Sequence, residues 1–202
     1  YNIIPIFIFD GKTPEIKQKL VQKRREKREK SKKQLNELLQ LSDINSPKMK
    51  QKMLALKRDT IKLKKTDIED VKNIIDSFGY TYMIADYEAD KLCAELVISN
   101  IVYACISEDT DLFVYGCPRI LRYLNLFNEV CILYDLKLIL KKLKLDFNTF
   151  KKICILSGCD YNETSIQIFK LYNIYLKYIK KERDMSFMTW INKWGDDYQI
   201  EE

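Results

Sequence analysis

The sequence predicts an α/β protein built on a parallel sheet that is flanked by helices. Three observations support this prediction. Short, continuous apolar runs alternate with segments of helical periodicity, acidic residues follow the ends of these runs, and one long segment is strongly basic. Apolar runs without alternation are typical of parallel strands buried on both faces. Their alternation with helical segments favours helices on both faces of the sheet.

The first predicted strand is the apolar run at residues 3–9, which ends at Asp10 and Gly11. A helix should follow, with Thr13 as its cap and Pro14 in its first position, because a hydroxyl and a proline suit these two places. The periodicity continues this helix to about residue 41.

The centre of that helix has no apolar side chain in residues 22–34. A helix that is polar all round has no core to lie on, so we expect it to project into solvent. A second helical pattern covers residues 48–78, and its first half is again rich in lysine. Its second half carries apolar residues at a spacing that should return it to the core, namely Ile68, Val71, Ile74 and Ile75. Residues 12–66 should therefore form a basic arch of two helices that turn near Asn45.

Beyond Gly79 the pattern alternates between strands and helices. Further strands are expected at residues 80–84, 101–106 and 130–134, and helices at residues 88–98, 136–143 and 148–156. The chain after Asp160 has a helical composition. We expect a core domain over residues 1–161 and a helical segment over residues 162–202.

Charge is distributed unevenly along the chain, although the net charge is only +6. Residues 12–65 hold 19 Lys and Arg against 6 Asp and Glu, whereas the remainder holds 16 against 23. Such a division indicates a phosphate-binding region next to a carboxylate-rich one.

Several classes of protein are disfavoured by composition. The chain has no histidine and no C-x-x-C pair, which argues against a zinc site and excludes a mechanism based on a Ser-His-Asp triad. Its six cysteines mostly lie in apolar runs and are expected to be reduced, as in intracellular proteins. No run reaches the roughly 18 apolar residues that cross a bilayer. The opening apolar run lacks the features of a signal peptide. The missing initiator Met suggests a fragment.

Acidic residues follow several of the predicted elements. They are Asp10, Glu88, Asp90, Glu108, Asp109, Asp111 and Asp160. Because ligands of parallel sheets bind beyond the carboxyl ends of the strands, these side chains are candidates for one shared site. Clustered carboxylates repel one another unless cations neutralise them, and oxygen-only ligands suit Mg²⁺ or Mn²⁺. Individually, such acids also serve as helix caps or as first-turn residues, and that alternative stays open.

Four segments resemble the flap endonuclease and Rad-type superfamily of structure-specific 5′ nucleases, in the order and at the spacings of that family. They are IFIFDGKTPEIK, YEADKLCAEL, VYACISEDTDLFVYG and ICILSGCDY. The resemblance spans residues 3–161, about four-fifths of the chain. It implies a PIN-like α/β core and hydrolysis of phosphodiesters in branched, 5′-flapped DNA during replication, repair or recombination.

The resemblance also implies roles for single residues. Metal ligands would be Asp10, Glu88, Asp90, Asp109, Asp111 and Asp160, holding two Mg²⁺ ions for which Mn²⁺ can substitute, with Glu108 in a supporting position. Asp90 stands where the family usually has Glu. Lys17 and Arg24, seven residues apart, would stabilise charge on the scissile phosphate as catalytic residues. The single-stranded flap would contact Arg25, Lys27, Arg28, Lys30, Lys32 and Lys33.

Two departures from the family pattern leave other functions open. The glycine-led start and first Asp of the family are absent, and the hairpin segment ETSIQIFKLYNIY has none of the usual glycines. A catalytically degenerate DNA-binding protein and a 5′ exonuclease acting on RNA therefore remain alternatives. We expect an intracellular monomer without a membrane partner or a recognisable sliding-clamp motif, in the nucleus of a eukaryote or in a cytoplasmic virus factory.

Overall fold

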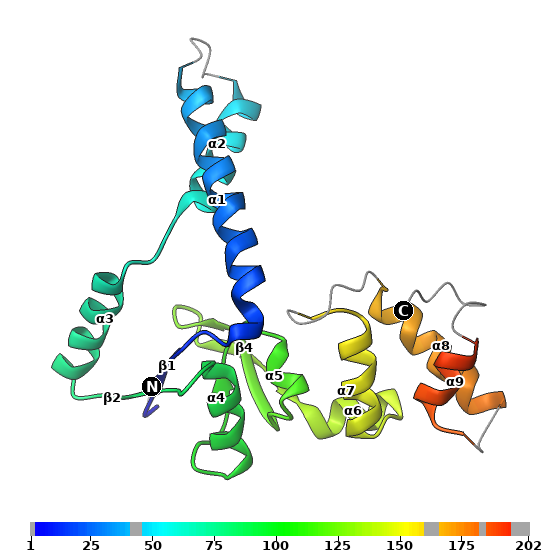
Figure 1. Ribbon diagram of the computed structural model, residues 1–202. Coiled ribbons are helices and arrows are strands. Elements are labelled where there is room, and N and C mark those ends of the chain that lie inside the picture. Colours follow the sequence, from blue (N-terminus) through cyan, green and yellow to red (C-terminus); the bar gives the residue numbers. More distant parts are fainter. Residues whose placement is uncertain (1–2, 41–45, 160–165, 182–184, 195–202) are drawn as a thin grey trace. The chain divides into compact units, whose positions relative to one another are not determined.

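The computed structural model describes residues 3–40, 46–159, 166–181 and 185–194, and the chain divides into two compact units, Tyr1–Glu88 and Ala89–Glu202 (Figure 1). The domain boundary expected after residue 161 falls within residues 160–165, which lie outside the described part. Among the described helices, none has both the length and the apolar character that crossing a bilayer requires.

Unit 1 contains a two-stranded parallel sheet of β1 (Ile6–Phe9) and β2 (Thr81–Ile84), with Ile6 opposite Thr81. The predicted strand began at residue 3, but Pro5 has no N–H to donate and β1 starts directly after it. Burial on both faces was also predicted, and this is wrong for unit 1. Phe7 is 38% exposed and Ile84 is 55% exposed, because a sheet of only two strands covers little apolar surface.

The basic region forms a helical hairpin in unit 1. A 3-10 turn, η1 (Glu15–Lys17), leads into α1 (Gln18–Leu39), which packs along α2 (Pro47–Thr60) as Figure 1 shows. Small and apolar residues at this contact are buried, namely Ser31, Leu38 and Leu56. The predicted start was wrong, because Pro14 has an extended backbone and the helix begins after it without a cap from Thr13. The expected turn near Asn45 lies outside the described residues.

The second predicted helix, residues 48–78, is two helices. α2 ends at Thr60, and α3 (Lys65–Ser77) starts after an extended stretch that ends at Lys64. The N–H of Lys64 donates to Oδ2 of Asp67 at 2.8 Å. This bond caps the N-terminus of α3, so α3 starts as a separate helix.

The prediction that all four apolar residues of α3 pack into the core is wrong for three of them. Of the four apolar positions, only Ile75 is buried, whereas Ile68 is 37%, Val71 46% and Ile74 56% exposed. The narrow sheet that α3 packs against covers one strip of the helix.

Unit 2 contains a three-stranded sheet in the order β3–β4–β5, formed by β3 (Cys105–Ile106), β4 (Arg119–Asn125) and β5 (Val130–Asp135). β3 and β4 are parallel, while β4 and β5 form an antiparallel hairpin. The strand expected at residues 130–134 is confirmed, but the sheet is mixed. Neither β4 nor the short helix α5 (Asp111–Val114) was predicted.

Two apolar clusters hold unit 2 together. One lies between α4 (Ala89–Ile98), the sheet and α5, around Val97, Leu112 and Ile120. The other joins α6 (Leu136–Leu143), α7 (Phe147–Leu156), α8 (Ile168–Lys181) and α9 (Phe187–Trp194), which confirms the helical prediction for the described part after Asp160. All six cysteines are free thiols, as expected.

We predict that Asp146→Ala destabilises unit 2 by about 1 kcal/mol at neutral pH, because Asp146 caps α7. Its side chain accepts from the N–H and the hydroxyl of Thr149 at 2.9 Å and 2.6 Å, and these bonds lower the pKa of Asp146. A lowered folded-state pKa means that the contribution is present above the unfolded pKa and is lost as pH falls through the folded one.

Urea unfolding across a descending pH series measures this effect. The difference between wild type and Asp146→Ala should shrink in acid. Asp146→Asn keeps an acceptor oxygen and should retain most of the stability without the pH dependence. A constant difference at all pH values would contradict the assignment.

Candidate active site

The loops after β1 and β2 adjoin in unit 1, and each carries a predicted metal ligand. The N–H of Gly11 donates to the carbonyl of Tyr87 at 2.6 Å, and the N–H of Ala85 donates to Phe9 at 2.9 Å. A Cβ on Gly11 would lie 1.8 Å from the carbonyl oxygen of Ala85, so only glycine permits this approach. The contact holds the segment of Asp10 beside the segment that leads into Glu88.

Lys17 forms an ion pair with Glu88 through Nζ and Oε1. The two side chains are only 13% and 22% exposed, so the pair is shielded from most solvent. A residue predicted to act on a phosphate thus contacts a predicted metal ligand. Lys17 also belongs to the 3-10 turn rather than to α1, so the spacing argument that placed it on one helical face with Arg24 does not apply.

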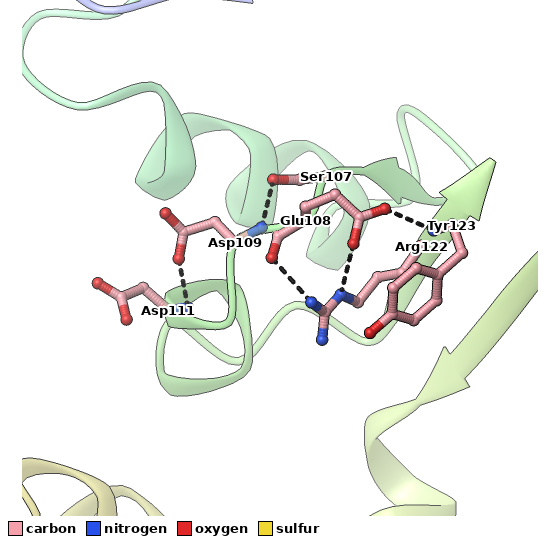
Figure 2. Close-up of polar contacts among 6 residues, drawn as sticks. All are labelled: Ser107, Glu108, Asp109, Asp111, Arg122 and Tyr123. Atoms are coloured by element: carbon pink, nitrogen blue, oxygen red, sulfur yellow. Dashed lines mark hydrogen bonds and ion pairs between the residues drawn. The ribbon is translucent and has the colours of Figure 1, made fainter. Parts of the chain in front are cut away.

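The loop after β3 in unit 2 positions Asp109 and Asp111 (Figure 2). The N–H of Asp109 donates to Oγ of Ser107 at 3.0 Å, and the N–H of Asp111 donates to Oδ1 of Asp109 at 2.9 Å. Figure 2 shows the carboxylates of Asp109 and Asp111 on the same side of the loop. The hydrogen bonds hold two acids close together, as an oxygen-ligand site requires.

Glu108 points the other way, toward β4 (Figure 2). Its carboxylate accepts from the backbone N–H of Tyr123 at 2.5 Å and from Nε of Arg122 at 3.3 Å. Nη2 of Arg122 also donates to the carbonyl of Glu108 at 3.0 Å. These contacts pin the loop to β4.

Arg122 is a site residue that the sequence analysis missed, because its strand was missed. Its guanidinium also lies over the rings of Tyr123 and Tyr134, at 5.1 Å and 5.8 Å from their centroids. The signal was a lone arginine inside the otherwise apolar run Ile-Leu-Arg-Tyr-Leu. A charge in that position needs a partner, and Glu108 supplies it.

The charges of Asp90 and Asp111 each raise the pKa of a cysteine thiol in unit 2. The pKa of Cys105 lies far above its ordinary value, chiefly through a hydrogen bond with Cys93 and burial, with a smaller contribution from the charge of Asp90. Burial and then the charge of Asp111 raise the pKa of Cys154 to about 11. The charges of Asp90 and Asp111 thus act on thiols of β3 and α7, respectively.

The predicted ligand set is distributed over both units. Asp10 and Glu88 belong to unit 1, while Asp90, Asp109 and Asp111 belong to unit 2, and Asp160 lies outside the described residues. Within the described ranges, no three Cys, Asp or Glu side chains are arranged to hold a metal ion. The donors are all carboxylate oxygens, which fits Mg²⁺ or Mn²⁺, and the complete set remains a prediction.

The predicted flap-binding cations lie on different parts of α1. Lys27 forms an ion pair with Asp59 of α2 at 3.3 Å, and Arg28 is half-buried. Lys32 and the catalytic candidate Arg24 are exposed. The remaining three line a shallow surface depression with Gln22, Glu26 and Glu29, namely Arg25, Lys30 and Lys33. This spacing puts them on one helical face.

Family models match two segments of the chain. The XPG N-terminal domain matches residues 1–31, and the XPG I-region matches residues 79–160. Flap endonuclease 1-A of Oryza sativa subsp. japonica is 34% identical over 205 residues, covering 100% of this chain and 51% of that relative. Flap endonuclease 1 of Theileria annulata is 33% identical over 201 residues, covering 98% and 37%. The chain thus spans about half, or less, of these relatives.

Solved structures have the same fold. Flap endonuclease-1 from Methanococcus jannaschii is 26% identical with a TM-score of 0.61, covering 98% of this chain and 61% of that one. The catalytic core of Rad2, solved in complex with DNA substrate, is 22% identical with a TM-score of 0.64, covering 98% and 60%. These matches confirm the predicted α/β fold class.

We predict that Lys17→Met strengthens Mg²⁺ binding by about fivefold, because the ion pair occupies the carboxylate of Glu88, one of the predicted metal ligands. Isothermal titration calorimetry with Mg²⁺ measures the change. Lys19→Met removes an exposed lysine nearby and serves as the matched control, with little expected effect. Equal affinities for wild type and Lys17→Met would show that the ion pair does not regulate access to Glu88.

Proposed function

Because this chain belongs to the XPG and flap endonuclease family, we propose that it supplies the catalytic core of a divalent-metal-dependent 5′ nuclease acting on branched, 5′-flapped DNA. The observation that carries this proposal is the placement of carboxylates on strand-end loops. The loops of Asp10 and Glu88 adjoin in unit 1, and Asp109 and Asp111 share one side of a loop in unit 2.

The carboxylates would hold two Mg²⁺ ions, with Mn²⁺ as a substitute. When held by these residues, Mg²⁺ would supply activation of water and charge neutralisation at the phosphodiester, so that no histidine base would be needed. The ligands in this proposal are Asp10, Glu88, Asp90, Asp109, Asp111 and Asp160. Glu108 orients the loop of Asp109 through its bonds to β4.

The basic hairpin would contact the substrate phosphates. Lys17 and Arg24 near the base of α1 would stabilise charge on the scissile phosphate. Arg25, Lys30 and Lys33 share a solvent-facing helical face and would bind the single-stranded flap. Lys27 is restrained by Asp59, so its contribution to DNA binding should be smaller.

The first test is cleavage of a 5′-flapped duplex by the full-length protein in the presence of Mg²⁺. Asp109→Ala should lower the cleavage rate by at least about a hundredfold, because it removes a metal-ligating carboxylate and the acceptor for Asp111 N–H. Asp76→Ala, which removes an exposed acid on α3, is the control and should cleave normally.

The same assay separates the alternatives. Folded protein that binds the flap but does not cut it with Mg²⁺ or Mn²⁺ would be a degenerate DNA-binding protein, and the nuclease proposal would be wrong. Faster cleavage of an RNA flap than of a DNA flap would favour a 5′ exonuclease acting on RNA.

A second prediction concerns the hairpin. Neutralising Arg25, Lys30 and Lys33 to Ala together should weaken flap binding and reduce the slope of log affinity against log salt by about 2, since each single-strand phosphate contact contributes about 0.7. Fluorescence anisotropy over a salt series measures the slope. The control triple variant replaces Lys142, Lys151 and Lys152 of unit 2 with Ala. Equal slopes for the two triple variants would rule out a specific role for this face of α1.

A further inference from the structure

Within the described residues, the edge strand of unit 2 is largely apolar and exposed. β5 is the last strand of its sheet in the described part of the chain, and its first four residues are exposed on both faces. Val130 is 55%, Ile132 49% and Leu133 48% exposed, and Cys131 is also exposed. Phe127 in the preceding turn is fully exposed.

The hydrogen-bond pattern shows which backbone groups of β5 face outward. Leu136 N–H donates to the carbonyl of Pro118 at 3.0 Å, and the pairing of β5 with β4 continues in the same register through Tyr134 and Ile132. Hydrogen-bonded and non-hydrogen-bonded pairs alternate along an antiparallel ladder. The N–H and C=O groups of Ile132 and Tyr134 therefore point to β4, and those of Cys131 and Leu133 point away from the sheet.

Natural edge strands are usually protected by charges, prolines or a covering element. The segment from Val130 to Tyr134 has no charge and no proline, and β-branched and aromatic residues favour strand pairing there. This edge has the chemistry of a template for another strand.

The helix that follows β5 is positively charged and would favour an acidic binding partner. α6 contains no acid, and Lys137, Lys141 and Lys144, at or directly after it, are exposed with a spacing that gathers them on one side. Lys137 stands two residues beyond the end of β5. A segment laid along β5 would therefore have one end close to a cationic helix.

We propose that the free edge of β5 binds an extended segment of a partner protein by strand addition. The partner segment is β-branched in its pairing region and carries acidic residues at the end that lies beside α6. The outward groups of Cys131 and Leu133 pair with its backbone, while α6 selects its charge. This interaction is independent of the proposed nuclease activity.

The test uses the full chain and a fluorescein-labelled peptide of sequence EETVTVTVTS. Anisotropy should show saturable binding that weakens with salt, and the peptide KKTVTVTVTS should bind at least about tenfold more weakly because it repels α6. Exchanging Lys137 and Lys141 for Glu should reverse this order of preference. The control exchange of Lys151 and Lys152 on α7 should leave it unchanged.

A backbone substitution tests the pairing itself. Leu133→Pro removes an outward N–H and leaves the ladder to β4 intact, so peptide affinity should fall about tenfold. Leu133→Val keeps that N–H and should bind normally. Amide hydrogen exchange of the wild-type chain provides a readout that needs no variant: the peptide should slow exchange at Cys131 and Leu133 but not at Ile132.

Three results would overturn the proposal. They are an absence of peptide binding, binding without protection of the outward amides of β5, and sedimentation showing that this edge pairs two copies of the chain. Protection of the same amides by flapped DNA but not by the peptide would assign the edge to nucleic acid instead.

Discussion

The interactions on which this structure depends are those that fix the acid-bearing loops at the strand ends. Like charges held near one another destabilise a fold unless the backbone is fixed and a counter-charge is present. Unit 1 meets this requirement with the close approach at Gly11 and with the ammonium of Lys17 on Glu88. Unit 2 meets it with hydrogen bonds inside the loop and with Arg122 behind it. Each acidic loop is thus organised by its own neighbours.

The basic residues of the helical hairpin have both structural and proposed functional roles. The helical hairpin begins directly after the loop of Asp10, so the residues proposed to contact DNA are continuous with the segment proposed to hold metal. On α1, some basic residues stabilise the hairpin, as Lys27 does through Asp59, and others remain on the outer face. Charge density alone does not distinguish these roles, but the partner of each side chain does.

The sequence predicted the strand ends well because an apolar run followed by Asp10-Gly11 or by the acids after β3 carries a local signal. Sequence-based prediction failed for elements whose structure depends on contacts with residues distant in the sequence. β4 was missed because Arg119 begins it and Arg122 interrupts its apolar run. Their guanidiniums pair with Tyr103 and Glu108 from elsewhere in the chain. The break between α2 and α3 was missed because helical periodicity continues across it. The contact of Lys17 with Glu88 joins residues far apart in sequence and has no local signature.

The extended stretch between α2 and α3 has a mechanical consequence. Four residues in extended form reach roughly 13 Å, so this connection is close to its full length and can pivot but hardly lengthen. On the other side of the hairpin, η1 leads without a break into α1, so this connection is helical and rigid. A pull on the hairpin is therefore transmitted through α1 to the loop of Asp10 and through the extended connection to α3.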